Sequence, residues 1–515
     1  MQLDEALRDH FGHPGFRPGQ REAVAAALAG RDVLLVMPTG SGKSLCYQLP
    51  ALIDRRLTVV VSPLVSLMQD QVEGLGGRGE LINAQREGSA NRASLERAIA
   101  GETRILYVAP ERFAAPGFAD RLAAARVGLF VVDEAHCVSE WGHDFRPDYL
   151  RLGEVAERLG AASIFATTAT ATPRVGLDVA RRLGLRDPVR IATGFDRPNL
   201  SYDVARLRSP RSKWAALRAL LAEPGALPAI VYTGTRKHAD EVAAALGAAL
   251  GLEVRSYHAG MERDPRADAQ RAFMSGRAAV VVATNAFGMG VDKADVRTVV
   301  HASVPASLEA YYQEAGRAGR DGRPSRCVLL AEARDKGLHV FFINQIEDAA
   351  AKRNRWRQYR EVWGFVEGEG CRRAAILRHF GDRGTPRPAG RCCDRCDGQL
   401  AAVAEALARS GPSGVERPRG TGVAPTGSAS VAAAIVAVVA GASPAVGRTR
   451  TVEILRGGRS KVVGKYGYDE LPGYGMLAEW RPDDLLREVD ALIESGRLRS
   501  TGGRFPKLAL ASDRA

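Results

Sequence analysis

The sequence predicts an α/β protein with two consecutive parallel-sheet domains, followed by a helical region, a cysteine cluster and a small α+β module. Short β-branched runs alternate with helix-like stretches from Asp32 to about Pro188, and the pattern repeats from about Pro228 to Leu330. Near-continuous apolar runs of this kind are typical of parallel strands covered on both faces. Because ligands bind at the carboxyl ends of such strands, the loops after the runs form the candidate site.

The runs predict the strands in chain order. In the first domain they are DVLLVM, LTVVVSP, RILYVAP, GLFVVD and ASIFATT, and in the second PAIVYT, EVRSYH, AAVVVAT, RTVVHAS and RCVLLA. The stretch from Thr193 to Asp203 is predicted to join the two domains. Residues 335–385 are predicted to be helical, because they contain amphipathic stretches. The Gly-, Pro- and Ser-rich stretch from Ala408 to Ser430 is typical of a flexible linker.

Composition narrows the class of protein. The 515 residues are 45% hydrophobic and carry a formal net charge of +13, which fits either plain solubility or, as we favour, a nucleic-acid partner. The N-terminal stretch contains acids and no apolar core, so it does not resemble a signal peptide. The apolar stretch from Ser430 to Ala442 is too short for a membrane span and predicts a buried helix, with no membrane partner. Seven cysteines, four of them clustered, favour the cytoplasm and a metal over disulfides.

The stretch MPTGSGKS, Met37 to Ser44, follows a predicted strand and opens a predicted helix. Its glycines let backbone amides point at phosphates, while Lys43 meets the terminal phosphates and Ser44 offers a hydroxyl to Mg²⁺. The strict pattern has Gly where Met37 stands, and a chance Gly-rich turn is the alternative. We predict an ATP and Mg²⁺ site here, with the cofactor-binding residues Thr39, Gly40, Gly42, Lys43 and Ser44.

Two carboxylates follow at the end of the strand GLFVVD. Asp133 is predicted to hold Mg²⁺ beside the phosphates, and Glu134 to orient or deprotonate the attacking water. The alternative is a pair of acids at a helix N-terminus.

The stretch YYQEAGRAGRDGR contains two arginines, Arg317 and Arg320, that would share a face of a helix. From the second domain they could reach the γ-phosphate as arginine fingers, and the alternative is a solvated basic helix. The predicted mechanism is that ATP clamps the two domains together and hydrolysis releases them. The predicted catalytic residues are Lys43, Asp133, Glu134, Arg317 and Arg320.

A loop rich in rings follows the carboxylates and includes Trp141, His143, Phe145 and Arg146. Rings beside a nucleic-acid groove stack on bases without regard to sequence. A loop attached to the strand that ends at Asp133 could therefore sense a base and move the catalytic carboxylates. The alternative is that Trp141 and Phe145 pack under the domain.

The motifs FGHPGFRPGQ, MPTGSGKSLCYQLPA, DEAHCVSEWGHDFRP, TATAT, FDRPNL, ATNAFGMGVDK and YYQEAGRAGRDG together resemble the RecQ family of DNA helicases, in helicase superfamily two, over nearly the whole chain. The resemblance implies two RecA-like domains, with adenine recognised by Arg17 and Gln20. It also implies that Asp292 lies near the nucleotide and that Thr284 and Asn285 lie near the DNA backbone. The ring-rich loop would couple single-stranded DNA to ATP hydrolysis.

The cysteine cluster resembles the zinc-binding subdomain of the same family. The resemblance implies that four thiolates bind Zn²⁺: Cys371, Cys392, Cys393 and Cys396. Many relatives space the last three as C-x-x-C-D-x-C, but Gly390 stands at the first of those positions here. The spacing therefore supports Cys392 less than the other three, and free buried cysteines are the alternative. Burial is the favoured interpretation for Cys46, Cys137 and Cys327.

The stretch from Val452 to Met476 resembles the RecQ C-terminal winged helix. Six basic residues between Arg448 and Lys465 face one acid, Glu453, which predicts a phosphate-binding surface. The stretch from Arg497 to Leu510 predicts a hairpin, the wing, with its turn at Gly502–Gly503. Many relatives carry a further helical DNA-binding domain, which we expect to be absent.

The expected domains are 1–197 and 198–334 (RecA-like), 335–402 (helical, zinc-binding), 403–429 (flexible linker) and 430–515 (winged helix). The resemblance implies an ATP-dependent 3′→5′ DNA helicase of replication, recombination and repair, located in the cytoplasm at the nucleoid. Its expected partners are single-stranded, duplex and forked DNA, and single-stranded-DNA-binding protein. One alternative is an RNA helicase, against which the winged helix and the ring-rich loop argue. The other is a DNA-stimulated ATPase that translocates, or switches DNA or partner binding, without unwinding.

Overall fold

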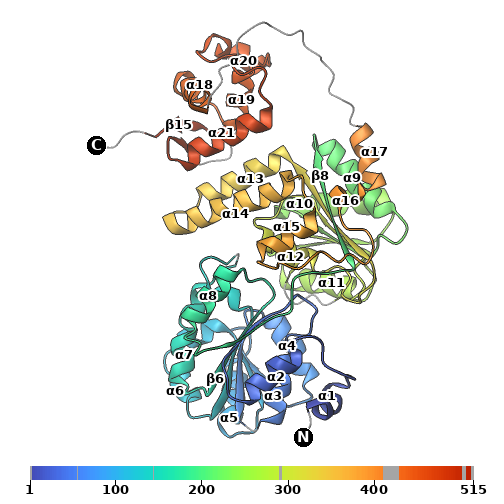
Figure 1. Ribbon diagram of the computed structural model, residues 1–515, viewed down its shortest axis with the longest axis vertical. Coiled ribbons are helices and arrows are strands. Elements are labelled where there is room, and N and C mark those ends of the chain that lie inside the picture. Colours follow the sequence, from blue (N-terminus) through green and yellow to red (C-terminus); the bar gives the residue numbers. More distant parts are fainter. Residues whose placement is uncertain are drawn as a thin grey trace. The chain divides into compact units, whose positions relative to one another are not determined.

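The structure is a computed structural model that describes residues 3–54, 56–142, 144–288, 293–409, 428–501 and 506–511. The chain divides into two compact units, whose elements are labelled in Figure 1. Unit 1 comprises Met1–Glu332 and Glu361–Arg409, and unit 2 comprises Ala333–Arg360 and Ser410–Ala515. Across the described ranges, no helix combines the length and the apolar character that crossing a membrane requires.

Lobe 1 of unit 1 contains a seven-stranded parallel sheet in the order β3-β4-β2-β5-β6-β1-β7. Its strands are β1 (Val33–Val36), β2 (Leu57–Val61), β3 (Gly79–Ile82), β4 (Ile105–Val108), β5 (Val127–Val132), β6 (Ser163–Thr168) and β7 (Val189–Ala192). Its helices are α1 (Leu3–Phe11), α2 (Gln20–Leu28), α3 (Leu45–Ile53), α4 (Val65–Gly74), α5 (Gly88–Ile99), α6 (Phe118–Leu122), α7 (Leu152–Arg158) and α8 (Pro173–Arg182), with the 3₁₀ turns η1 (Pro110–Ala114), η2 (Ala135–Val138) and η3 (Pro147–Tyr149).

Lobe 2 of unit 1 contains a six-stranded parallel sheet in the order β10-β11-β9-β12-β13-β8. Its strands are β8 (Leu200–Leu207), β9 (Ala229–Tyr232), β10 (Val254–Tyr257), β11 (Val280–Ala283), β12 (Thr298–His301) and β13 (Ser325–Glu332). Its helices are α9 (Pro210–Ala222), α10 (Arg236–Leu250), α11 (Arg263–Met274) and α12 (Leu308–Ala315). The predicted fold class, two parallel-sheet domains in tandem, is therefore confirmed.

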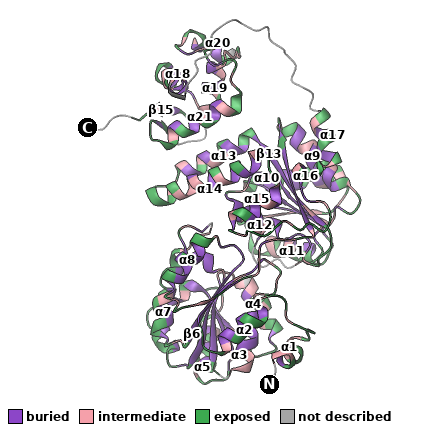
Figure 2. Cartoon of the chain, viewed as in Figure 1, coloured by how far each residue is buried: buried purple, intermediate pink, exposed green. Residues whose placement is uncertain are grey.

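The inner strands of each sheet are buried on both faces, as the purple strands of Figure 2 show. In β5, Phe130 and Val132 belong to one apolar cluster, whereas Leu129 and Val131 belong to another on the opposite face. Alternate side chains of a strand point to opposite faces, so a strand covered on both sides must be apolar throughout. This requirement explains the unbroken run GLFVV.

Every predicted strand run contains a strand, but three strands were not predicted. The edge strands β3 and β7 have sequences, GELI and VRIA, that lack a continuous apolar run, and β7 is only partly buried. The third, β8, starts at Leu200 inside the segment predicted to be only a connection, and it pairs with β13 along eight residues.

The remaining part of unit 1 packs beside β8. It contains the end of α14 (Ala349–Glu367), α15 (Arg372–His379), α16 (Asp394–Asp397) and α17 (Ala401–Arg409). Residues 403–409, expected to begin the flexible linker, are helical because Val403 and Ala406 are buried in the core of lobe 2. The rest of that expected linker, residues 410–427, lies outside the described residues.

Unit 2 contains α13 (Ala333–Asn344), the first part of α14, α18 (Ser428–Gly441), α19 (Arg448–Leu455), α20 (Lys461–Lys465), η4 (Tyr468–Glu470), α21 (Pro482–Glu494) and the antiparallel pair β14 (Leu498–Ser500) and β15 (Leu508–Leu510). Helix α18 is the apolar helix predicted from the sequence, and Val431, Ile435 and Val438 are fully buried in it. The predicted hairpin turn at Gly502–Gly503 lies outside the described residues.

Candidate functional site

A cavity of about 730 Å³ lies at the carboxyl ends of β1 and β5 and is lined by residues of both lobes. Lobe 1 contributes the segment after β1 and the two carboxylates after β5, and lobe 2 contributes the segment after α12. Predicted site residues that line it are Arg17, Gln20, Thr39, Gly40, Gly42, Lys43, Ser44, Asp133, Glu134, Arg317 and Arg320. A cavity of this size suits a small-molecule ligand.

The loop from Met37 to Ser44 wraps one end of the cavity and leads into α3. Gly40 and Gly42 have φ angles of 79° and 84°, which favour glycine, and a Cβ on Gly42 would lie 2.6 Å from the Gln20 side chain. The Lys43 amine donates to the carbonyls of Met37 (3.2 Å) and Pro38 (3.3 Å). Backbone amides at the start of a helix, with a lysine beside them, form an anion site.

Met37 stands where the strict loop pattern has glycine, and the structure gives the reason. Its backbone N–H donates to the Thr168 carbonyl at 3.1 Å, so the residue extends the pairing of β1 with β6. Its side chain is 1% exposed and belongs to an apolar cluster of lobe 1. The chain therefore uses this position for the core and begins its glycine-rich turn at Gly40.

The two carboxylates face a buried lysine. Burial, followed by the charge of Glu134, raises the pKa of Asp133 to about 7, whereas Lys43 opposes the shift. Burial likewise lowers the pKa of Lys43, against the attraction of Glu134 and Asp133. The site thus contains charges that are desolvated before any ligand arrives.

Glu134 has a strained backbone, with a φ of 48° that side-chain-bearing residues seldom adopt. It occupies the N-cap position of η2 but makes no side-chain capping hydrogen bond, which disfavours the helix-terminus alternative. Its Oε2 atom lies 3.3 Å from Nδ1 of His136, which is also 2.9 Å from the Thr168 hydroxyl.

The arginines of lobe 2 lie in turns after α12, because the helix ends at Ala315 and Gly319 adopts a φ of 53°. The expected placement on one helix face is therefore not what the structure has. Arg317 is 4% exposed. A Cβ on Gly40 would lie 3.4 Å from Cγ of Arg320, so this side chain packs directly on the glycine-rich loop.

Arg17 and Gln20 hold the loop from the side of α2. Gln20 donates to the carbonyls of Ser41 (3.0 Å) and Gly42 (3.1 Å), and Arg17 donates to the carbonyl of Gly40 at 2.8 Å. Asp292, also predicted near the nucleotide, lies outside the described residues. Thr284 and Asn285 follow β11 at the carboxyl edge of the second sheet, where Thr284 is half-buried and Asn285 is exposed.

The ring-rich loop divides its side chains between the interior and the surface. Trp141 packs against the core of lobe 1, and the Arg174 guanidinium lies 3.4 Å from its ring centroid. Phe145 is 36% exposed, and Arg146 pairs with Asp144 at 3.0 Å. The packing alternative thus applies to Trp141 and does not apply to Phe145, while His143 lies outside the described residues.

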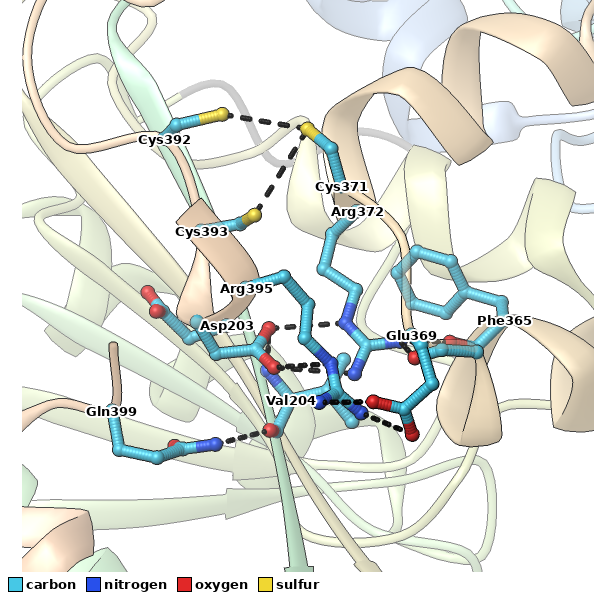
Figure 3. Close-up of polar contacts among 12 residues, drawn as sticks. Asp203, Val204, Phe365, Glu369, Cys371, Arg372, Cys392, Cys393, Arg395 and Gln399 are labelled. Atoms are coloured by element: carbon cyan, nitrogen blue, oxygen red, sulfur yellow. Dashed lines mark hydrogen bonds and ion pairs between the residues drawn. The ribbon is translucent and has the colours of Figure 1, made fainter. Parts of the chain in front are cut away.

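The four clustered cysteines meet beside β8. Cys371 Sγ lies 3.6 Å from Cys392 Sγ and 4.0 Å from Cys393 Sγ, and Figure 3 shows both side chains pointing toward Cys371. With Cys396 included, all four sulfurs lie within 4.8 Å of one another. Sulfurs bound tetrahedrally at about 2.3 Å from one zinc lie roughly 3.8 Å apart, so the donor set fits a zinc ion.

Cys371 is prepared to act as a thiolate. Burial would raise its pKa, but hydrogen bonds from the Ala374 backbone N–H and from the neighbouring thiols outweigh this effect and lower it. The pKa of Cys392 is raised, to about 11, by burial and by Cys371.

Sequence reasoning missed the buried arginines beside the cysteines. Arg372 is 2% exposed and donates to both carboxylate oxygens of Asp394, at 3.0 and 3.1 Å. Asp394 also accepts from the Val204 N–H of β8 at 3.0 Å. The adjacent arginines of CRRAAILRHFGD could have indicated this arrangement, because arginines buried in a packed segment need acidic partners.

The basic residues of unit 2 also divide in two. Arg448 is ion-paired with Asp490 in the interior, so it does not belong to the predicted phosphate-binding surface. Arg450 pairs with Glu453, whereas Arg459 and Lys465 are exposed.

Four family models match this chain. They are the DEAD/DEAH box helicase (residues 17–177), the helicase conserved C-terminal domain (212–322), the RecQ zinc-binding domain (333–398) and the RQC domain (429–515).

Curated relatives and solved structures agree with these matches. The ATP-dependent DNA helicase RecQ of Bacillus subtilis is 34% identical over 98% of this chain and 82% of its own length. RecQ of Pasteurella multocida is 38% identical over 76% of this chain and 61% of its own length. The helicase MrfA, solved with DNA and AMPPNP, has a TM-score of 0.55 at 19% identity, over 65% of this chain and 50% of its own, and supports the fold alone.

The raised pKa of Asp133 predicts how pH affects stability. A carboxyl whose folded pKa lies above its unfolded value costs stability as pH rises from about 4 to about 7. Asp133→Asn should therefore raise the melting temperature without Mg²⁺ and nucleotide at pH 8, and the gain should shrink at pH 5.5. Thermal denaturation measures this, with the exposed Asp120→Asn as control. An equal gain at both pH values would contradict it.

Proposed function

This chain belongs to the RecQ family of ATP-dependent DNA helicases, and on that premise we propose that it hydrolyses ATP between its two lobes to drive 3′→5′ unwinding of DNA. The observation that carries the proposal is the single cavity lined by the glycine-rich loop and two carboxylates of lobe 1 and by Arg317 and Arg320 of lobe 2. A nucleotide bound there would touch both lobes, so its hydrolysis would alter their contact.

The predicted catalytic residues that line the cavity each have a proposed role in phosphoryl transfer. The loop amides and Lys43 bind the phosphates, and Ser44 and Asp133 hold Mg²⁺, which supplies charge neutralisation at the phosphates when bound. Glu134 orients the attacking water and accepts its proton. Arg317 and Arg320 stabilise the charge that develops on the γ-phosphate, an effect worth roughly 10³–10⁵ in rate.

Adenine recognition is proposed for Arg17 and Gln20. Both residues line the cavity and donate to carbonyls of the glycine-rich loop. A base that contacts them could therefore change the position of the loop amides that bind the phosphates. Asp292 is proposed to lie near the nucleotide on the family resemblance alone.

DNA binding is proposed for three surfaces. The exposed Phe145 stacks on a base, Thr284 and Asn285 contact the backbone, and the exposed Arg459 and Lys465 of unit 2 bind duplex phosphates. Because η2 links the ring-rich loop directly to Glu134, a base held by Phe145 can bias the strained backbone at that carboxylate. His143 and Arg146 are proposed to belong to the same coupling loop.

A metal site and a cellular role complete the proposal. We propose that Cys371, Cys392, Cys393 and Cys396 hold one Zn²⁺, on the strength of their sulfur spacing. A role in replication, recombination and repair, single-stranded-DNA-binding protein as a partner, and a location at the nucleoid are proposed from the family resemblance.

The test of the function is unwinding of a forked DNA duplex with ATP and Mg²⁺. We expect single-stranded product from the wild-type protein and none from Lys43→Ala, because that variant lacks the cation at the terminal phosphates. Lys43→Ala should still bind DNA. DNA-stimulated hydrolysis without strand separation would favour the ATPase that translocates or switches, and equal activity on RNA would favour an RNA helicase.

Phe145→Ala should weaken the response to DNA without harming the fold. Stacking on a base is worth about 1–3 kcal/mol, so the concentration of single-stranded DNA that half-stimulates the ATPase should rise roughly 5- to 150-fold. The melting temperature and the DNA-independent rate should not change. Leu177→Ala, at another exposed apolar position of lobe 1, is the control. An unchanged DNA response would remove Phe145 from the interface.

Metal analysis tests the cysteine cluster. We expect about one zinc per wild-type chain, and loss of it in both Cys393→Ser and Cys392→Ser, because a structural site needs four ligands. Cys327→Ala, which alters a buried cysteine of lobe 2 outside the cluster, should keep its zinc. A Cys392→Ser protein with full zinc content would show that Cys392 is not a ligand.

A further inference from the structure

Arg197 lies in the segment that connects the two lobes, and its guanidinium donates to four main-chain carbonyls. Nη1 donates to Thr39 (3.4 Å) and Gly316 (3.2 Å), and Nη2 donates to Ala318 (3.0 Å) and Gly319 (3.2 Å). Within the described part of the chain, these four hydrogen bonds all go to main-chain carbonyls. The Arg197 side chain therefore cross-links separate backbone segments.

The four carbonyls belong to opposite walls of the ATP cavity. Thr39 is part of the glycine-rich loop of lobe 1, whereas the other three lie in the turn of lobe 2 that carries Arg317 and Arg320. The same two segments also touch directly, since the Thr39 hydroxyl lies 3.4 Å from the Gly316 carbonyl. Arg197 is thus bonded to the backbone on both sides of Arg317 and immediately before Arg320.

Arg197 does not line the 730 Å³ cavity itself. It lines a separate space of about 280 Å³ behind the loop, together with Arg320 and Gly319. An effect of Arg197 on hydrolysis must therefore pass through the residues that do line the cavity, and not through contact with the nucleotide.

The backbone around Arg197 is fixed from the other side. Arg373, which is 1% exposed, donates to the Arg197 carbonyl at 2.8 Å and pairs with Asp196. Two residues further on, Asn199 donates to the Gly319 carbonyl at 2.8 Å. Because this segment is held in place, the Arg197 guanidinium loses little conformational freedom when it binds the four carbonyls. Accurate positioning of another group requires a support that is fixed in this way.

We propose that Arg197 is a positioning residue for ATP hydrolysis, which holds the turn carrying Arg317 and Arg320 against the glycine-rich loop. The proposal rests on the proposed function, because it assumes that these arginines act on the γ-phosphate. Lysine cannot replace Arg197, since one ammonium lacks the fork of donors that reaches two segments at once.

The test compares Arg197→Lys and Arg197→Gln with wild type in ATP turnover at saturating single-stranded DNA. A misplacement of about 1 Å can cost roughly 100-fold in rate, so we expect kcat to fall about 10- to 100-fold while KM for ATP changes less than about threefold. Binding of mant-ADP should be unchanged, whereas affinity for ADP with aluminium fluoride, which mimics the transition state, should fall about as much as kcat. Arg206→Lys, an exposed arginine on β8, is the matched control.

A combined variant separates positioning from an independent role. If Arg197 acts by positioning Arg317 and Arg320, then adding Arg197→Lys to the variant Arg317→Ala/Arg320→Ala should not slow its residual turnover further. Losses that multiply would overturn the proposal. So would wild-type kcat in Arg197→Lys, or a parallel fall in mant-ADP affinity and melting temperature, which would indicate a merely structural role.

The same experiment separates failure of the Arg197 proposal from failure of the proposed function. A wild-type protein whose ATP turnover does not respond to DNA would contradict the proposed function itself. A wild-type protein that responds to DNA, beside an Arg197→Lys protein that matches it, would contradict only the role of Arg197.

Discussion

Contact between the glycine-rich loop of lobe 1 and the turn of lobe 2 that carries Arg317 and Arg320 is the interaction on which the account depends. Thr39 and Gly316, one from each segment, lie 277 residues apart in the sequence. In the structure, however, the Thr39 hydroxyl lies 3.4 Å from the Gly316 carbonyl, and Arg320 packs on Gly40. Neither lobe alone can surround the phosphates of a nucleotide. A cavity with one wall from each lobe makes their relative position depend on what the cavity contains.

The cavity stores unfavourable electrostatics and strain before a ligand binds. Asp133 has a raised pKa and Lys43 a lowered one, both chiefly through burial, and Glu134 has a positive φ. Buried charges and a strained backbone of this kind are unfavourable in themselves, and a charged ligand would offset the burial of the charges by supplying partners. Gln20, which lines the cavity, and Arg197, which does not, both donate to main-chain carbonyls of the glycine-rich loop and so hold the loop in place.

Much of the fold and part of the site could be predicted from the sequence, because local pattern determines both. Strands buried on two faces must be apolar throughout, so β1 and β5 were recognisable, and a glycine-rich turn between strand and helix marked the anion site. Long-range partners leave no such mark. The edge strand β7, the cross-link by Arg197 and the burial of Arg448 against Asp490 depend on segments that are distant in the sequence. The division of the ring-rich loop into a packed Trp141 and an exposed Phe145 likewise depends on Arg174 of α8.

Mixing two variants, each defective in a different wall of the ATP cavity, shows most directly whether one chain supplies both walls. Lys43→Ala chains lack the lobe 1 cation, and Arg320→Ala chains lack a lobe 2 cation. The measurement is ATP turnover by an equimolar mixture of the two at saturating single-stranded DNA. The account predicts a rate no higher than the mean of the two variants assayed separately, because every chain lacks one wall of its own cavity. Recovery well above that mean would show that a second chain can supply the missing wall, and would contradict the account.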